Sequence, residues 1–296
     1  MYGDPVAHPR LSKKLWSSVG VSALALVAAV VVIMAMLQYR GTTTKATPVS
    51  GTTSASVPVR STSTLLSTSA TPSPAKASTT PTASPTGLAL ANSILSAPSG
   101  ASVLVIGDGT GDATNEWVAV WARDHLATNA TVSYSAWGWV SASYATAVRY
   151  GTTGPTINVW NASVRSPDMA LEPARIAKAW QTSDLVLLSY GHRRAPATIT
   201  AQMDAVLAAI RAKNATVPIV VMIQNPDRAD TATIQLENTQ KIQAWAGAHG
   251  FATVDIYSAF MADPTPRNTM VESDGSPSPQ GSQLWATTLA NALKAA

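Results

Sequence analysis

A glycine-rich segment that follows an apolar run is the first place where residue types and spacing suggest chemistry. Residues 107–112 read GDGTGD. A dinucleotide-binding turn needs glycine where Asp112 stands, and a phosphate-binding P-loop needs a lysine that this segment lacks. A calcium loop needs glycine where Ala113 stands. The segment therefore predicts a tight turn between a strand and a helix, and we expect no nucleotide cofactor.

Three carboxylates begin in this turn. Asp108, Asp112 and Glu116 follow one another at intervals of four residues. Carboxylates bind hard divalent cations, so a metal site is one interpretation of this spacing. The other is a turn carboxylate, a helix N-cap at Asp112 and a solvated helix face. We expect the second arrangement, without a metal.

Three further polar segments follow apolar runs or precede the last helix. Residues 191–194 read GHRR, residues 224–226 read QNP, and residues 273–282 read SDGSPSPQGS. The guanidinium groups of Arg193 and Arg194 would favour a carboxylate, phosphate or sulfate ligand. The alternative is that both face solvent or that one of them pairs with a carboxylate of the first turn.

Alternating apolar runs and helical periods indicate how these segments are positioned. Predicted strands cover residues 102–106, 131–135, 156–160, 185–190, 219–223 and 253–256. Predicted helices cover residues 113–126, 173–180, 199–213, 231–249 and 283–294. Strands that are apolar on both faces and separated by helices predict a parallel sheet covered on two sides. We expect one three-layer α/β domain over residues 100–296, with its site at the carboxyl ends of the strands.

Taken together, these segments resemble the SGNH/GDSL hydrolase family, especially its actinobacterial and phage versions. The matching stretches read VLVIGDGTG, EW, VWN, LVLLSYGH, VVMIQNP and DG with PSPQGSQLWA, over about residues 100–294. The resemblance implies a flavodoxin-like sheet of five parallel strands and hydrolysis of esters on acylated sugars, lipids and similar substrates. In that family a serine is the nucleophile, a glycine and an asparagine help to form the oxyanion hole, and a late segment supplies an aspartate and a histidine.

The resemblance fails at the catalytic positions. Gly109 stands where the family has its serine, and Arg193 stands where it has its asparagine. Asp274 matches the late aspartate, but Ser276 stands where a histidine is expected. A hydroxyl is a poor nucleophile until a neighbouring base removes its proton, so losing both groups removes the mechanism. We therefore expect a domain that has lost hydrolysis.

The altered cleft could still bind an envelope glycan, an acylated molecule or another anionic ligand without cutting it. Backbone N–H groups of the first turn and an arginine on the opposite side would hold such a ligand. Asn161 precedes an alanine that stands where the family has its oxyanion glycine. The expected ligand-binding residues are Asp108, Gly109, Asn161, Arg193 and Ser276.

Two other functions stay open. Thr110, His192 and Asp274 offer a hydroxyl, an imidazole and a carboxylate, so an esterase or acyl hydrolase with non-standard residues is one alternative. Against it, a shift of one residue redirects a side chain, and a misplacement of about 1 Å can cost on the order of a hundredfold in rate. The other alternative is a structural or surface-exclusion protein with an empty pocket.

The first 99 residues differ in composition from the rest. Residues 15–39 are apolar and uncharged, and at about 1.5 Å per residue they are long enough to cross a hydrocarbon core of about 30 Å. We expect an uncleaved anchor in the lipid bilayer there, the alternative being a cleaved signal peptide. Residues 1–14 then form a short cytoplasmic tail. Residues 40–99, rich in Ser, Thr, Pro and Ala, predict a disordered stalk that carries the domain outside the cytoplasm.

Composition excludes several classes of function. The 296-residue chain has no Cys, which excludes disulfides, thiol catalysis and zinc sites built on Cys. Its net charge is +4, but residues 1–107 hold seven of the 20 basic side chains and one of the 16 acidic ones. The folded part is therefore slightly acidic. A nucleic-acid partner needs a basic surface, so we expect none.

Overall fold

The computed structural model describes residues 87–166, 168–192, 194–228 and 232–294. The expected cytoplasmic tail, the expected anchor and residues 40–86 of the expected stalk lie outside the described residues. Within the described part of the chain, no helix is long and apolar enough to cross a membrane.

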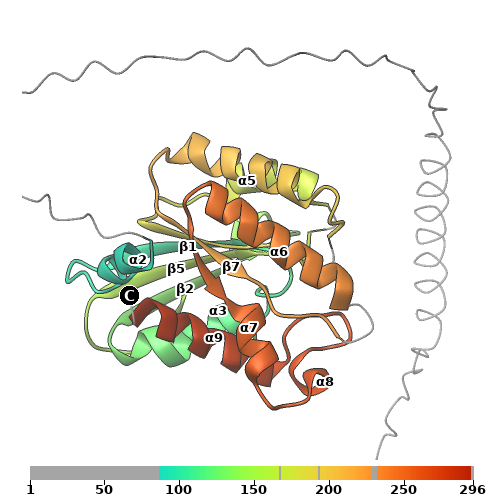
Figure 1. The fold of residues 1–296 in the computed structure, drawn as a ribbon. Coiled ribbons are helices and arrows are strands. Elements are labelled where there is room, and N and C mark those ends of the chain that lie inside the picture. Colours follow the sequence, from blue (N-terminus) through green and yellow to red (C-terminus); the bar gives the residue numbers. More distant parts are fainter. Residues whose placement is uncertain (1–86, 167, 193, 229–231, 295–296) are drawn as a thin grey trace, which may run out of the picture. The chain divides into compact units, whose positions relative to one another are not determined.

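One sheet forms the middle layer of the domain (Figure 1). Its strands are β1 (Ala101–Gly107), β2 (Thr131–Gly138), β3 (Ser143–Tyr144), β4 (Val148–Tyr150), β5 (Thr156–Ser163), β6 (Leu185–Ser189), β7 (Ile219–Ile223) and β8 (Ala252–Asp255). The order is β3-β2-β5-β1-β6-β7-β8, with β4 also paired to β2. The strands from β2 to β8 along this order are parallel, and β3 and β4 are antiparallel to β2. The predicted strands are confirmed apart from their ends.

The sheet contains the expected five-stranded flavodoxin-like order, 2-1-3-4-5, in β5, β1, β6, β7 and β8, and it has β2 as a sixth parallel strand. Strand β5 lies between β1 and β2 and pairs with both in parallel register. Strands β3 and β4 were not predicted, because they are only two and three residues long and are largely exposed. Neither composition nor periodicity marks such short strands.

Helices cover both faces of the sheet. They are α2 (Leu88–Leu95), α3 (Trp117–Val120), α4 (Glu172–Ala179), α5 (Ile199–Lys213), α6 (Ala232–Ala248), α7 (Ile256–Ala262), α8 (Arg267–Met270) and α9 (Pro279–Lys294), with the short turns η1 (Trp121–His125), η2 (Leu126–Thr128) and η3 (Met169–Leu171). Figure 1 shows α5 and α6 on one face and α3, α7 and α9 on the other. Strand β1 serves both layers, since Val103 and Val105 join the core under α9 while Leu104 and Ile106 join the core under α5. The predicted three-layer α/β architecture is confirmed.

Two predicted boundaries were wrong. The helix expected to begin at Ala113 begins at Trp117, because the carboxylate of Glu116 accepts the N–H of Ala113 at 2.8 Å and holds residues 113–116 in the loop. The expected stalk was to extend to residue 99, but ordered structure is described before that position. Residues 88–95 form α2, whose buried Ala91 packs in the same core as α9.

Candidate functional site

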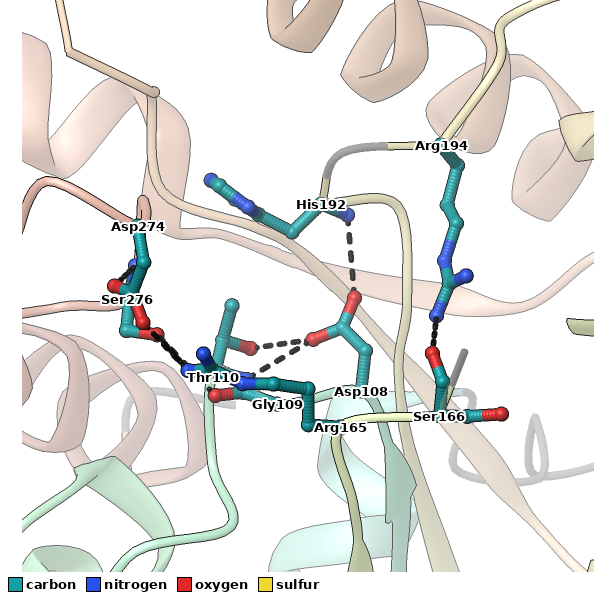
Figure 2. A pocket seen from close by; sticks show the side chains of 9 residues that line it. All are labelled: Asp108, Gly109, Thr110, Arg165, Ser166, His192, Arg194, Asp274 and Ser276. Carbon is teal, nitrogen blue, oxygen red and sulfur yellow. Dashed lines mark hydrogen bonds and ion pairs between the residues drawn. The ribbon is translucent and has the colours of Figure 1, made fainter. Parts of the chain in front are cut away.

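A cleft opens at the carboxyl edge of the sheet, beside β1. The loops after β5 and β6 flank it, since these strands lie on either side of β1. Ligands of open α/β sheets bind where the strand order reverses in this way. The cavity measures about 200 Å³. Figure 2 shows its lining residues, which are Asp108, Gly109, Thr110, Arg165, Ser166, His192, Arg194, Asp274 and Ser276.

The carboxylate of Asp108 connects three strand ends. Its Oδ1 accepts hydrogen bonds from Oγ1 of Thr110 at 2.8 Å and from Nε2 of Gln224 at 3.0 Å. Its Oδ2 accepts from the backbone N–H of His192 at 3.2 Å. Asp108 is buried, so these donors replace the water that its charge would otherwise require. Asp108 therefore stabilises the floor of the cleft.

Thr110 is buried, and its hydroxyl belongs to the same network. The hydroxyl donates to Asp108 and accepts from Nε2 of Gln224 at 3.1 Å. A hydroxyl has a single proton to donate. In this arrangement that proton is directed at a carboxylate of the turn and is not directed at the imidazole of His192.

The imidazole of His192 lies between the cleft and a carboxylate that the sequence analysis missed. Its Nε2 is 3.9 Å from Oδ1 of Asp227, and both side chains are buried. Gly275 packs against this ring with a φ of +83°, and a Cβ there would overlap Cε1 of His192. The loop between α8 and α9, residues 271–278, is here called the late loop. It can approach His192 because Gly275 has no side chain.

The space over Gly109 is filled by Arg165, at the end of β5. A Cβ on Gly109 would lie 2.9 Å from Cβ and 3.1 Å from Nε of Arg165. The guanidinium Nη2 of Arg165 lies 2.5 Å from Oδ2 of Asp274 and 3.3 Å from Oγ of Ser276 (Figure 2). The position expected for a nucleophile and the expected triad aspartate are therefore both in contact with one arginine.

Hydrogen bonds within the late loop hold Asp274 and Ser276 in place. Oδ1 of Asp274 accepts the N–H of Ser276 at 3.1 Å, and Oγ of Ser276 donates to the carbonyl of Gly109 at 3.3 Å. Burial opposes ionisation of Asp274, but the hydrogen bonds from Arg165 and Ser276 outweigh it and lower the pKa of Asp274 below its ordinary value. Asp274 therefore carries a charge that is already paired.

A second hollow adjoins the cleft at the Arg165–Asp274 pair. It measures about 350 Å³ and shares Arg165, Asp274 and Ser276 with the cleft. Burial raises the pKa of Glu116, which lines this hollow, to about 7, and burial also raises the pKa of Asp112. Asp112 does not cap a helix as predicted, because its Oδ2 accepts the backbone N–H of Arg165 at 2.9 Å.

One predicted ligand-binding residue does not line the cleft, and another lies outside the described residues. Asn161 is buried, and its Nδ2 donates to the carbonyl of Gly111 at 2.7 Å and to the hydroxyl of Tyr134 at 2.9 Å. Asn161 therefore stabilises the first turn. Arg193 lies outside the described residues. Its neighbour Arg194 lines the cleft, and its guanidinium donates to the carbonyl of Ser166 at 3.2 Å.

No group of three or more acidic, His or Cys side chains arranged to hold a metal is found among the described residues. Asp108, Asp112 and Glu116 each accept hydrogen bonds from a different part of the chain. Asp112 and Glu116 nevertheless interact through a side-chain hydrogen bond, and the charge of Asp108 acts on both. The loop brings these carboxylates near one another, since the helix begins only at residue 117.

No protein-family model and no curated protein matches the chain. Solved structures that resemble it include LAE5, an alpha/beta hydrolase enzyme from the metagenome of Lake Arreo in Spain, with 14% identity, a TM-score of 0.50, and coverage of 68% of this chain and 98% of that one. The lipase/acylhydrolase from Enterococcus faecalis has 16% identity and a TM-score of 0.48, covering 66% and 95%. A member of the lipolytic protein G-D-S-L family from Veillonella parvula DSM 2008 has 13% identity and a TM-score of 0.43, covering 63% and 94%.

At sequence identities this low, a structural match gives information about the fold and not about the function. The parallel sheet, the helices on both its faces and the cleft beside β1 agree with the resemblance seen in the four loop segments. The described domain is therefore similar in fold to the alpha/beta hydrolase LAE5, and the resemblance to SGNH/GDSL hydrolases rests on its loop segments.

Proposed function

We propose that this domain does not hydrolyse esters and that its cleft binds an anionic ligand, such as an acidic sugar of a cell-envelope glycan. The observation that carries this proposal is the side chain of Arg165 lying over Gly109 and paired with Asp274. An acyl-enzyme mechanism needs an attacking oxygen and a base at these positions. Here Gly109 supplies no oxygen, and Ser276 supplies no base.

The charges of the cleft support an anion as its ligand. Asp274 is paired with Arg165. The buried carboxylate of Asp108 already accepts hydrogen bonds from Thr110, from the N–H of His192 and from Gln224. Arg194 lines the cleft and forms no ion pair among the described residues. A guanidinium with spare donors at a cavity binds a carboxylate, phosphate or sulfate through charge-assisted hydrogen bonds.

Activity is tested on the full chain with p-nitrophenyl acetate and a fluorophosphonate label. We expect no turnover and no label. The esterase alternative would be supported by turnover that Thr110→Ala abolishes, and this result would overturn the proposal.

Binding is tested by the thermal shift of the full chain in glucuronate, with glucose as the uncharged comparison. A ligand that binds only the native state raises the apparent stability. We expect glucuronate alone to raise the melting temperature, and Arg194→Gln to remove the shift. Arg149→Gln, in the exposed strand β4, is the matched control and should keep it. No shift with glucuronate would favour a structural protein with an empty cleft.

We also propose that residues 15–39 anchor the chain in a membrane and that residues 100–296 lie outside the cytoplasm. The support is the uncharged apolar run of residues 15–39 and the Ser/Thr/Pro-rich composition that follows it. Alkaline extraction should leave the full chain in the membrane and release a variant that lacks residues 15–39. External protease should reach the domain in intact cells, and protection from it would contradict this orientation.

A further inference from the structure

A separate cavity lies at the opposite edge of the sheet, where β2 and β5 begin. It measures about 320 Å³ and shares no lining residue with the cleft. Helices α2 and α9 and the turns η1 and η2 contribute to its wall. The lining residues are Asn92, Leu95, Ser96, Trp121, His125, Leu126, Asn129, Ala130, Pro155, Ile157, Ala290, Leu293 and Lys294.

Apolar side chains of the core form much of this cavity. Trp121, Ile157 and Leu293 belong to the buried core and line it together with Ala290. A cavity of about 300 Å³ or more, with mostly apolar walls and a few polar groups, is the usual form of a site for a small molecule. Its walls would favour an apolar body of a ligand, since apolar surface gains by leaving water.

The polar groups of this cavity favour negative charge. Lys294 and His125 line it, and its lining includes no Asp or Glu. Burial lowers the pKa of His125, and the nearby charge of Lys294 lowers it further, so the two side chains are electrostatically coupled. Asp124 also faces His125, but Asp124 is paired with Arg123 at 2.7 Å. A ligand carboxylate at Lys294 would therefore complement the charge of this rim.

The local backbone is also unusual. The turn η1 is a π-helix over Trp121–His125, between α3 and the 3-10 turn η2. Such π-helical turns are rare in proteins, and those that occur are often found at functional sites. This one supplies Trp121 to the apolar wall and His125 to the polar rim, so the irregular turn carries both kinds of group that the cavity presents.

We propose that this cavity is a second binding site, which takes a small monocarboxylate with an apolar body. The apolar part lies against Trp121 and Leu293, and the carboxylate lies at Lys294. The site is independent of the cleft and of the function proposed for the cleft, because the two cavities lie at opposite edges of the sheet and share no residue.

The test measures the binding of 3-phenylpropionate to the full chain by thermal shift and ligand-detected NMR. Its uncharged isostere, 3-phenylpropionamide, is the comparison ligand. We expect saturable binding of the acid and binding of the amide that is weaker by about tenfold, since a charge-assisted hydrogen bond is lost. Lys294→Gln should weaken the binding of 3-phenylpropionate by a similar factor. Lys213→Gln is the matched control, because Lys213 also ends its helix, α5, and should change nothing.

A third variant tests the apolar wall. Ala290→Trp fills the cavity and should abolish binding of both probes. Because this substitution can also disturb the fold, the result at Lys294 stands as the independent check. Equal binding of acid and amide, equal binding by the two lysine variants, or no binding to the full chain would each overturn the proposal. Binding that Arg194→Gln removes and Lys294→Gln leaves intact would place the probe in the cleft and would also overturn it.

Discussion

The side chain of Arg165 lies over the backbone of Gly109, so that a Cβ on Gly109 would come within 2.9 Å of Cβ of Arg165. The two residues belong to loops that follow adjacent parallel strands, β1 and β5. Any side chain at position 109 must therefore displace the arginine that pairs with Asp274. The absence of a side chain at Gly109 and the Arg165–Asp274 ion pair are therefore parts of one packing arrangement.

Restoring the serine should not restore an esterase. Gly109→Ser is expected to show no turnover of p-nitrophenyl acetate, because Ser276 cannot act as a base. The variant should also be less stable by about 1 to 3 kcal/mol, because the new Cβ crowds Arg165. Chemical denaturation checks the stability. The double variant Gly109→Ser with Arg165→Gly removes the Cβ and Nε that crowd the new side chain and should recover part of the lost stability, still without turnover. Measurable turnover by either variant would show that another residue serves as the base.

The ion pair should control the titration of Asp274. Burial favours the neutral carboxyl, and the hydrogen bonds from Arg165 and Ser276 reverse this and lower the pKa of Asp274. In Arg165→Met the pKa of Asp274 should rise, as measured by carbon NMR of the side-chain carboxyl. Asp263, held by Thr265, should keep its own lowered pKa and serves as the internal control. An unchanged pKa of Asp274 would contradict the pairing.

The difference in stability between the wild-type protein and Arg165→Met should depend on pH. A lowered pKa in the folded state stabilises the fold above the ordinary pKa, and this contribution disappears as the pH falls through the lowered value. Wild-type protein should therefore exceed Arg165→Met in stability at pH 7, and the two should converge in acid. Both side chains of the pair are about one-third or more exposed, so the difference at pH 7 should stay below about 1 kcal/mol.

Glu116 should make the fold less stable as the pH rises. Its pKa is raised by burial to about 7, above the ordinary 4.5, so between these values the unfolded chain loses a proton that the folded chain keeps. Wild-type stability should fall across this range, by at most about 3 kcal/mol, and Glu116→Gln should remove that fall. Urea denaturation from pH 4.5 to 8 measures it. Glu237→Gln, on an exposed helix face, is the control and should leave the slope unchanged.

Gly275 should be more sensitive to substitution than another glycine of similar backbone conformation. Gly275 and Gly250 have φ angles of +83° and +71°, which L side chains adopt with strain of about 1 to 2 kcal/mol. A Cβ on Gly275 would also overlap His192, whereas a Cβ on Gly250 would meet nothing within 4 Å. Gly275→Ala should therefore lose more stability in denaturation than Gly250→Ala. Equal losses would mean that His192 moves aside freely.

Much of the fold could be predicted because its physical signals are local. Strands β1, β6 and β7 are apolar on both faces, and α5 begins and ends where its periodic pattern does. Helix α2 was missed because it follows a Ser/Thr/Pro-rich stretch and is only eight residues long. The place of β5 beside β1 depends on long-range pairing, which no single segment carries.

The candidate site was predictable only where loops follow recognisable strands. Asp108 and His192 come together because the carboxyl ends of parallel strands share one edge of the sheet, and Asp274 joins them from the loop between α8 and α9. Arg165 was missed because its role depends on what it contacts across the sheet. One signal could have indicated it: Arg165 lies two residues after the end of β5, the strand that carries Asn161. Asp227, two residues after Asn225, offered a similar signal near the end of β7.

The late loop is pinned at both ends by its own backbone. Val271 forms an isolated β-bridge with Pro277. The backbone N–H of Glu272 donates to the carbonyl of Ser276 at 2.8 Å, and the N–H of Ser278 donates to the carbonyl of Met270 at 2.9 Å. The backbone of this loop is therefore held in place and cannot move far when a ligand binds. Adaptation to its shape falls to the long, rotatable side chain of Arg165, whose rearrangement is far quicker than the movement of a lid.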